Sequence, residues 1–317
     1  MLNISLIGLG RMGSKYFRIL KKNDNFNLIK ILRKKNYIQN NSSAQFYTNK
    51  KRFFLKNKKK NNAYIIASPI NTHYEYIKTI LSKKAPLIVE KPIVDNIHEL
   101  KKIKILSHNI KHPVLVNHID LYNPAFKKLE KKLKLIGNYN KIKIEFGKFK
   151  KIYKINKKTN IIFPYFDWLP HPLAIAIKLV GFPKKIKILK EKTTIKKKFI
   201  FQKMHLRLFC KQKTVDIFFS NDYKIPKRRI EIKGDRGLIK YDAYKTKSLI
   251  LKVKNEKTIP YSFNNTPLEN LLKVFHDAII HKRKINDINL SVKVMKIIFL
   301  IQQKLNKTNI NVNLIRN

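Results

Sequence analysis

The sequence predicts an α/β protein in two parts: an N-terminal doubly wound parallel sheet and a C-terminal α+β domain with a mainly antiparallel sheet. Up to about residue 120, short apolar runs alternate with segments of helical period, which is typical of parallel strands buried on both faces. A glycine-rich turn follows the first of these runs. From about residue 142, apolar residues alternate with polar ones, as in a sheet with one buried face.

The first strand and its turn lie in residues 4–13, I-S-L-I-G-L-G-R-M-G. Gly8, Gly10 and Gly13 have the G-x-G-x-x-G spacing of a dinucleotide-binding Rossmann sheet. In such a turn, the first glycine permits a sharp exit from the strand, the second lets a pyrophosphate approach the backbone, and the third lets the helix pack closely. The helix N-terminus then favours the bound anion. The alternative is an ordinary glycine-rich turn between a strand and a helix.

A second apolar strand is predicted at Phe26–Leu32, and the residue after it bears on the cofactor. About 20 positions after the glycines, an acidic residue binds the adenosine ribose of NAD, whereas an arginine accommodates the 2′-phosphate of NADP. Arg33 occupies that position. The sequence therefore favours NADP over NAD, with chance placement of a basic residue as the alternative.

Composition predicts a folded globular chain. With 317 residues and 44% hydrophobic residues, it is long enough for about two packed domains. No apolar run reaches the roughly 18 residues that span a bilayer, and the first strand starts too early for a signal peptide, so we expect a cytoplasmic protein. The single cysteine, Cys210, lies in the apolar phase of a strand and is predicted to be a core residue.

The charge is strongly basic, with 71 Lys and Arg against 19 Asp and Glu, for a net charge of +52. Such a balance is typical of nucleic-acid binding. The basic residues are, however, spread along the whole chain, and no nucleic-acid motif is present, so a solvated lysine-rich surface is the favoured interpretation. The lysine runs at 56–60 and 196–198 are predicted to lie in loops.

Two further strands of the first domain end in polar residues. Ala63–Ala67 is followed by S-P-I-N-T-H (68–73), where Thr72 and Glu75 have capping-box spacing for a helix. His73 is expected either to face the cofactor or only to pack. Pro86–Val89 is followed by Glu90 and Lys91, and a lysine beside a carboxylate in a ligand crevice can donate or accept a proton.

Together, the glycine turn, A-S-P-I-N-T-H (67–73) and V-E-K-P (89–92) resemble the glucose-fructose oxidoreductase / inositol dehydrogenase family (Gfo/Idh/MocA). The resemblance implies an N-terminal Rossmann domain, a C-terminal domain with a largely antiparallel sheet, and NAD(P)-dependent oxidation or reduction of sugars and polyols. It also implies that Lys91 is catalytic. Residues 114–126, V-L-V-N-H-I-D-L-Y-N-P-A-F, continue the resemblance, and 117–125 are similar to members that oxidise UDP-N-acetylamino sugars.

The second domain contains D-W-L-P-H (167–171), which resembles the family's D-x-x-x-H. If this segment is helical, Asp167 and His171 lie on one face and can address one substrate. The alternative is that Asp167 caps a helix and His171 is partly buried without a catalytic role. The family's glycines before the aspartate are absent, and Ala174 stands where the family usually carries a further aspartate.

Apart from this motif, the second domain is predicted to be a sheet closed by helices. Period-two strands are expected around residues 142–146, 204–210, 215–219 and 249–253, with a hairpin at 230–241, and two core helices are expected after residue 266. The predicted division is residues 1–120 for dinucleotide binding and 121–317 for substrate binding and oligomerisation. The resemblance implies pairing of copies through the C-terminal sheet.

The favoured function is an NAD(P)-dependent oxidoreductase acting on a secondary alcohol or ketone of a sugar, polyol or nucleotide sugar. His171 is the candidate base, Lys91 stabilises the reacting oxygen, and Asp167 orients His171 or binds a neighbouring hydroxyl. The alternative is a non-catalytic binding protein for a dinucleotide or sugar nucleotide on the same fold. No metal ligands are predicted. The predicted cofactor contacts are Gly8, Gly10, Arg11, Met12, Gly13, Arg33, Ser68, Pro69, Asn71, His73, Glu90 and Lys91.

Overall fold

The computed structural model describes residues 1–34, 44–55, 62–149, 163–196, 199–245, 249–253, 259–261 and 266–307. The chain divides into two compact units, Met1–Asn117 with Leu268–Met295, and His118–Pro267 with Lys296–Asn317. The first unit therefore ends its main segment three residues before the predicted division at 120. It also contains Leu268–Met295, which the predicted division had placed in the second domain.

The first unit confirms the predicted Rossmann sheet. Within the described residues, six parallel strands lie in the order β3-β2-β1-β4-β5-β6. Their bounds are β1 (Leu2–Ile7), β2 (Phe26–Leu32), β3 (Gln45–Tyr47), β4 (Asn62–Ile66), β5 (Leu87–Val89) and β6 (Val114–Val116). The strand order reverses between β1 and β4, and open parallel sheets bind their ligands beyond the strand ends at such a reversal.

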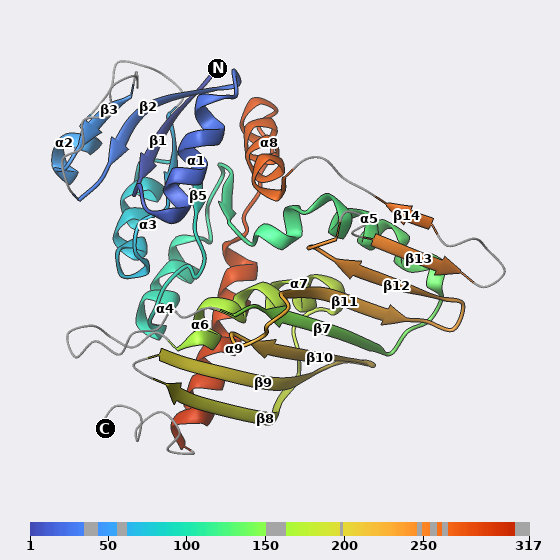
Figure 1. The fold of residues 1–317 in the computed structure, drawn as a ribbon. Coiled ribbons are helices and arrows are strands. Elements are labelled where there is room, and N and C mark those ends of the chain that lie inside the picture. The colour runs from blue at the N-terminus through green and yellow to red at the C-terminus, as the bar shows by residue number, and fades with distance from the viewer. Residues whose placement is uncertain are drawn as a thin grey trace. The chain divides into compact units, whose positions relative to one another are not determined.

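Helices connect these strands, and a late segment of the chain joins them (Figure 1). The helices are α1 (Arg11–Lys21), α2 (Lys50–Phe54), α3 (His73–Ser82), α4 (Ile97–Leu106) and α8 (Pro267–Ile280). After α8, Val114 N donates to Ile285 O (2.8 Å) and Asp287 N donates to Val114 O (2.9 Å), which forms a parallel bridge beside β6. These backbone hydrogen bonds explain why Leu268–Met295 belongs to the first unit.

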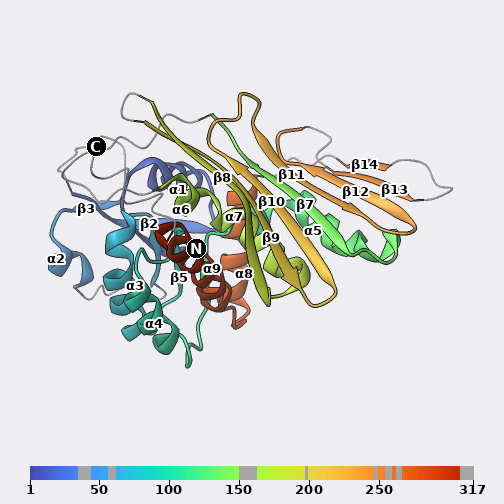
Figure 2. The ribbon, with the colours of Figure 1, turned by 90° about the horizontal axis from the view of Figure 1, so that it is seen from below.

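The second unit confirms the predicted, mainly antiparallel sheet (Figure 2). Within the described residues, eight strands lie in the order β14-β13-β12-β11-β7-β10-β9-β8, and β7 with β10 is the parallel pair. The bounds are β7 (Lys141–Gly147), β8 (Lys185–Lys196), β9 (Phe199–Cys210), β10 (Lys213–Ser220), β11 (Lys227–Lys233), β12 (Gly237–Asp242), β13 (Leu249–Val253) and β14 (Ile259–Tyr261).

One face of this second sheet is apolar and covered by helices. The alternating strand residues, among them Ile144, Ile217 and Ile230, are buried there, and Cys210 is buried on β9. The sheet packs against α5 (Pro124–Lys132), α6 (Pro164–Trp168) and α7 (Pro170–Val180). The short helices η2 (Ile119–Tyr122) and η3 (Leu133–Ile136) flank α5, and α9 (Ile288–Lys307) contributes its end from Lys296 onwards.

The other face of the second sheet carries paired charges. Asp216 accepts from Arg207 Nε (2.7 Å), Lys227 Nζ donates to Glu145 (2.9 Å), and Arg229 Nε donates to Asp242. Two faces of such different chemistry are what period-two alternation specifies. Pairing of two copies through this sheet stays a prediction, which the molar mass in solution would test.

Two local features of the second unit differ from the sequence-based expectations. Lys196 ends strand β8 and so does not lie in a loop, whereas Lys197, Lys198 and the run 56–60 lie outside the described residues. The predicted single helix over Asp167 and His171 is divided at Leu169 between α6 and α7. Pro170 and Pro172 fall in the first turn of α7, where the missing N–H groups need no helical partner.

Candidate functional site

The glycine turn joins the carboxyl ends of β1 and β4. Gly8 has φ +93°, and a Cβ atom on it would lie 2.6 Å from the carbonyl oxygen of Ala67 and 2.6 Å from Ser68 N. The backbone of the turn is fixed by Gly8 N, which donates to Leu32 O (2.8 Å), and by Ala67 N, which donates to Ile7 O (2.7 Å). Only glycine meets both the conformation and the close approach at this position.

Gly13 and Gly10 differ in what surrounds them. A Cβ on Gly13 would lie 2.1 Å from Gly8 O, so α1 rests directly on the turn. Gly10 has a negative φ, and a Cβ added to it would meet no atom within 4 Å, so nothing in the described protein requires glycine there. An approaching ligand does require it, because a side chain would occupy the space of a pyrophosphate at the helix N-terminus.

The N-terminus of α1 is suited to an anion in other respects. Gly10 is its N-cap and makes no side-chain capping hydrogen bond, and the first turn of α1 contains no acidic residue. Arg11 is exposed and Met12 half-buried in that turn. The predicted dinucleotide therefore fits this element by space and by charge.

The turn after β4 corrects the prediction for Thr72. A short 3-10 helix, η1 (Ile70–Thr72), precedes α3, and the Thr72 side chain does not cap α3. Its hydroxyl donates instead to Pro69 O (2.7 Å) and lies 2.7 Å from the Ser68 hydroxyl. The capping-box prediction was wrong because the η1 turn holds Thr72 in a helical conformation, with its hydroxyl directed backwards along the chain.

His73 is buried, and both of its ring nitrogens face backbone carbonyls. Nδ1 lies 3.0 Å from Pro92 O, and Nε2 lies 2.9 Å from Ser68 O. Burial lowers the pKa of His73, and its hydrogen bonds to these backbone carbonyls oppose that shift. In the described protein, His73 thus ties the turn after β4 to the turn after β5. Pro69 and Asn71 are exposed in the first of these turns.

The turn after β5 contains a buried carboxyl group. Glu90 Oε1 accepts from Tyr16 (3.0 Å) and from Asn117 Nδ2 (2.5 Å). Burial raises the pKa of Glu90, while the hydrogen bond from Asn117 and the charge of Lys91 oppose the rise. Lys91 is half-buried beside it, and the Lys91–Pro92 peptide bond is cis. Sequence analysis gave Asn117 no role, although its position directly after β6 was a signal for one.

Arg33 lies where the sequence predicts it, directly after β2. Its backbone N–H donates to Tyr47 O at the end of β3 (2.9 Å), and its side chain is half-buried. The structure thus places Arg33, the glycine turn, Ser68 and Lys91 at the carboxyl ends of strands of one parallel sheet.

The second unit contains a buried histidine–carboxylate pair that sequence analysis did not predict. His171 Nδ1 lies 2.8 Å from Asp120 Oδ2, and the side chains are 9% and 3% exposed. Asp120 lies in η2, 51 residues before His171. The predicted partner, Asp167, is half-buried within α6, where Phe163 is the N-cap, so Asp167 does not cap that helix.

Three strands of the second sheet contribute side chains to the surroundings of this pair. Arg228 Nε on β11 lies 3.2 Å from Asp120 Oδ1. The Phe146 ring on β7 stacks on the His171 ring, with centroids 6.1 Å apart, and also lies 5.3 Å from the Arg228 guanidinium carbon. Tyr241 on β12 is buried, and its burial, together with the charge of Asp120, raises the pKa of its hydroxyl.

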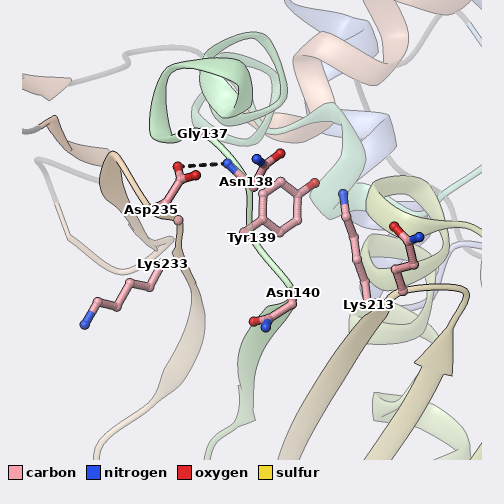
Figure 3. A pocket seen from close by; sticks show the side chains of 9 residues that line it. Gly137, Asn138, Tyr139, Asn140, Lys213, Lys233 and Asp235 are labelled. Carbon is pink, nitrogen blue, oxygen red and sulfur yellow. Dashed lines mark hydrogen bonds between the residues drawn. The ribbon is translucent and has the colours of Figure 1, made fainter.

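A separate pocket of about 590 Å³ lies at one end of the second sheet and contains none of the predicted site residues (Figure 3). Lys213 lies over the Tyr139 ring (3.8 Å), and Asn138 N donates to Asp235 Oδ1 (3.0 Å) within its lining. In the part of the chain that the structure describes, no group of three or more His, Cys, Asp or Glu side chains is placed to hold a metal, and no helix is long and apolar enough to cross a membrane.

The fold and the glycine turn together define a dinucleotide-binding protein of the Rossmann class, and the sequence comparison gives the family. Residues 2–118 match the model of the Gfo/Idh/MocA family, described as an oxidoreductase family with an NAD-binding Rossmann fold. This match confirms the resemblance seen in the motifs. A search of curated proteins found no match.

Solved structures share the fold over nearly the whole chain. One is UDP-N-acetylglucosamine 3-dehydrogenase from Acidithiobacillus ferrooxidans, with TM-score 0.74, 15% identity, and 95% of this chain and 96% of that one covered. A second is biliverdin reductase from Synechocystis with biliverdin and NADP+, with TM-score 0.73, 12% identity, and 95% and 98% covered. A third is an oxidoreductase from Agrobacterium radiobacter with NAD+, L-tartaric acid and magnesium, with TM-score 0.75, 15% identity, and 92% and 93% covered.

Proposed function

We propose that this protein is an NAD(P)-dependent oxidoreductase that interconverts a secondary alcohol and a ketone on a sugar, polyol or nucleotide sugar. The observation that supports this most directly is the pair formed by His171 and Asp120. Its hydrogen bond of 2.8 Å fixes which nitrogen of His171 carries the proton, and that is the arrangement a general base requires.

The proton chemistry follows from the donors and acceptors. An ionised carboxylate only accepts hydrogen bonds, so neutral His171 carries its proton on Nδ1 and directs it to Asp120. Nε2 is then the basic nitrogen, which takes the hydroxyl proton as the alcohol is oxidised. The buried carboxylate also stabilises the imidazolium formed in this step.

Lys91 serves the same reaction from the turn after β5. An ammonium group stabilises negative charge that develops on the reacting oxygen, or relays its proton. Asp167 binds a neighbouring hydroxyl of the substrate, since the orienting function assigned to it from sequence belongs to Asp120. The bound nicotinamide supplies the acceptor of the hydride in the oxidation and the donor in the reduction.

The dinucleotide contacts follow the fit of the first unit. Gly8, Gly10, Arg11, Met12 and Gly13 surround the pyrophosphate at the N-terminus of α1. The other proposed contacts come from the strand ends, namely Arg33, Ser68, Pro69, Asn71, His73, Glu90 and Lys91. Of these, His73 acts through the two turns that it joins.

Incubation with a panel of sugars, polyols and nucleotide sugars tests the proposed function. With NADP or NAD present, we expect at least one of them to produce reduced nicotinamide, followed by fluorescence. Tight dinucleotide binding without turnover on any member of the panel, in either direction, would favour the non-catalytic binding protein instead. Turnover of an unrelated conjugated ketone or tetrapyrrole alone would overturn the assignment of the substrate class.

We expect this protein to bind NADP more tightly than NAD. A guanidinium pairs with two oxygens of a phosphate, and Arg33 occupies the position where Rossmann domains distinguish the two cofactors. Arg33→Asp should reverse the preference, and Lys34→Asp, the same charge change one residue later, should not. Calorimetry measures both affinities, and equal affinity of the unmodified protein for NADP and NAD would refute the assignment.

A further inference from the structure

Arg228 is a cation placed on the buried face of the second sheet. On β11 it shares a face with Ile230 and Ile232, which are both buried, and its own side chain is 23% exposed. An arginine buried to this extent is costly unless its charge is neutralised. The carboxylate that neutralises it is Asp120, whose Oδ1 lies 3.2 Å from Arg228 Nε.

The same carboxylate bonds His171. Asp120 Oδ2 accepts from His171 Nδ1, so a single negative charge lies between one permanent cation and one ionisable imidazole. With His171 neutral, the three side chains have a net charge of about zero, and with His171 protonated they have about +1. A net charge in a buried cluster is unfavourable, so the cluster favours neutral His171.

The neighbouring side chains of β7 and β12 add no charge to the cluster. Tyr241 on β12 is uncharged, and its hydroxyl has no hydrogen-bond partner among the described residues. On β7, Phe146 faces the cluster, while Lys143 and Glu145 project from the opposite face of the sheet.

The remaining ionisable groups belong to the elements packed on α7. His118 precedes η2 and is buried, and Asp167 is half-buried in α6. Asp216 on β10 is neutralised on the far face of the sheet by Arg207 and Lys141. On β11, Arg229 points to that far face and pairs with Asp242.

We propose that Arg228 is a positioning residue that keeps His171 uncharged at neutral pH by neutralising the negative charge of Asp120. In the oxidation direction, this makes His171 ready to take a proton, a consequence that rests on the proposed function. Without Arg228, the state of the pair with zero net charge would be protonated His171 beside ionised Asp120. Protonated His171 cannot accept a proton, so it could not act as the base.

The test is the pH titration of the His171 ring by NMR, with its signal among the nine histidines assigned from the His171→Gln spectrum. Arg228→Gln removes the charge and keeps a polar side chain, whereas Arg228→Met removes both the charge and the polarity. We expect both variants to raise the midpoint of the His171 titration by about one pH unit or more, and Arg228→Lys to restore it.

Arg229→Gln is the matched control, because it removes the same charge from the adjacent residue on the other face of the sheet. It should leave the midpoint of the His171 titration unchanged. An unchanged midpoint in Arg228→Gln would overturn the proposal, and so would an equal rise in Arg229→Gln. If only one of the two uncharged Arg228 variants folds, its midpoint alone decides.

The pH dependence of activity is a second, independent test of the role of Arg228. If a substrate is turned over, the acid limb of the kcat/KM profile should move to higher pH in Arg228→Gln by the same amount as the His171 midpoint. A shift of the midpoint in a protein without activity would support the role of Arg228 and count against the proposed function. Activity with an unshifted midpoint would support the proposed function and count against the role of Arg228.

Discussion

Lys91→Ala and His171→Ala should each lower turnover by a factor of about a hundred or more, with little change in dinucleotide affinity. The reason is that both side chains are proposed to act on the reacting oxygen in the transition state, so their loss affects the chemical step more than binding. Steady-state kinetics at saturating substrate and calorimetry of the dinucleotide separate the two quantities. Should Lys91 only contact the cofactor, Lys91→Ala would weaken binding and leave turnover at saturation nearly intact.

The pH profile makes the assignment of His171 specific. A protonated imidazole cannot accept the hydroxyl proton, so the unmodified protein should lose activity as the pH falls through the titration of the base. His205→Ala is a matched control, because His205 also contacts an aspartate, Asp216 at 3.3 Å, but on the far face of the sheet. If His171→Ala keeps full turnover and the same acid limb, another group is the base.

Gly10→Ala and Gly13→Ala should affect different properties of the protein, although both glycines belong to the same motif. Gly13→Ala would bring a Cβ to 2.1 Å from Gly8 O, so α1 must move away from the turn. We expect a loss of stability of about 1–3 kcal/mol or more, typical of overpacking. Gly10→Ala has nothing within 4 Å of the new Cβ and should change stability by less than about 0.5 kcal/mol.

Cofactor binding distinguishes the same two variants. Gly10→Ala should weaken NADP binding by a factor of about ten or more, because its methyl group occupies the space through which the pyrophosphate approaches the backbone. Thermal unfolding and calorimetry on both variants measure these effects. Unchanged NADP affinity in Gly10→Ala would show that the pyrophosphate does not lie on this turn, and an unchanged melting temperature in Gly13→Ala would contradict the close packing of α1.

The parts of the fold that follow local patterns could be predicted from the sequence. β2 has the predicted bounds Phe26–Leu32, since five of its seven residues are apolar, as in a strand of a buried parallel sheet. The buried residues Ile142, Ile144 and Phe146 of β7 follow from period-two alternation. Lys91 and His171 were also predicted as site residues from sequence, but through resemblance to a family and not through any pattern that determines what they touch.

The alternation of apolar residues on β11 also contains a signal for Arg228. Arg228 occupies the phase of Ile230 and Ile232, so alternation alone places a cation on the buried face of β11. A buried arginine requires a carboxylate nearby. That requirement is a sequence-based signal for a buried ionic site, although it does not say which carboxylate.

By itself, the sequence determined the two-part α/β fold, the glycine turn at the end of β1 and the alternation of the second sheet, because each depends on residues close together in the chain. The tertiary structure decided that Asp120 bonds His171 Nδ1, and that the Thr72 hydroxyl turns back to Pro69. Helical spacing gives the face on which a side chain lies, but a hydrogen bond also depends on how helices and strands pack. Asp120 reaches His171 across 51 residues because η2 packs against α7, and no local period encodes that contact.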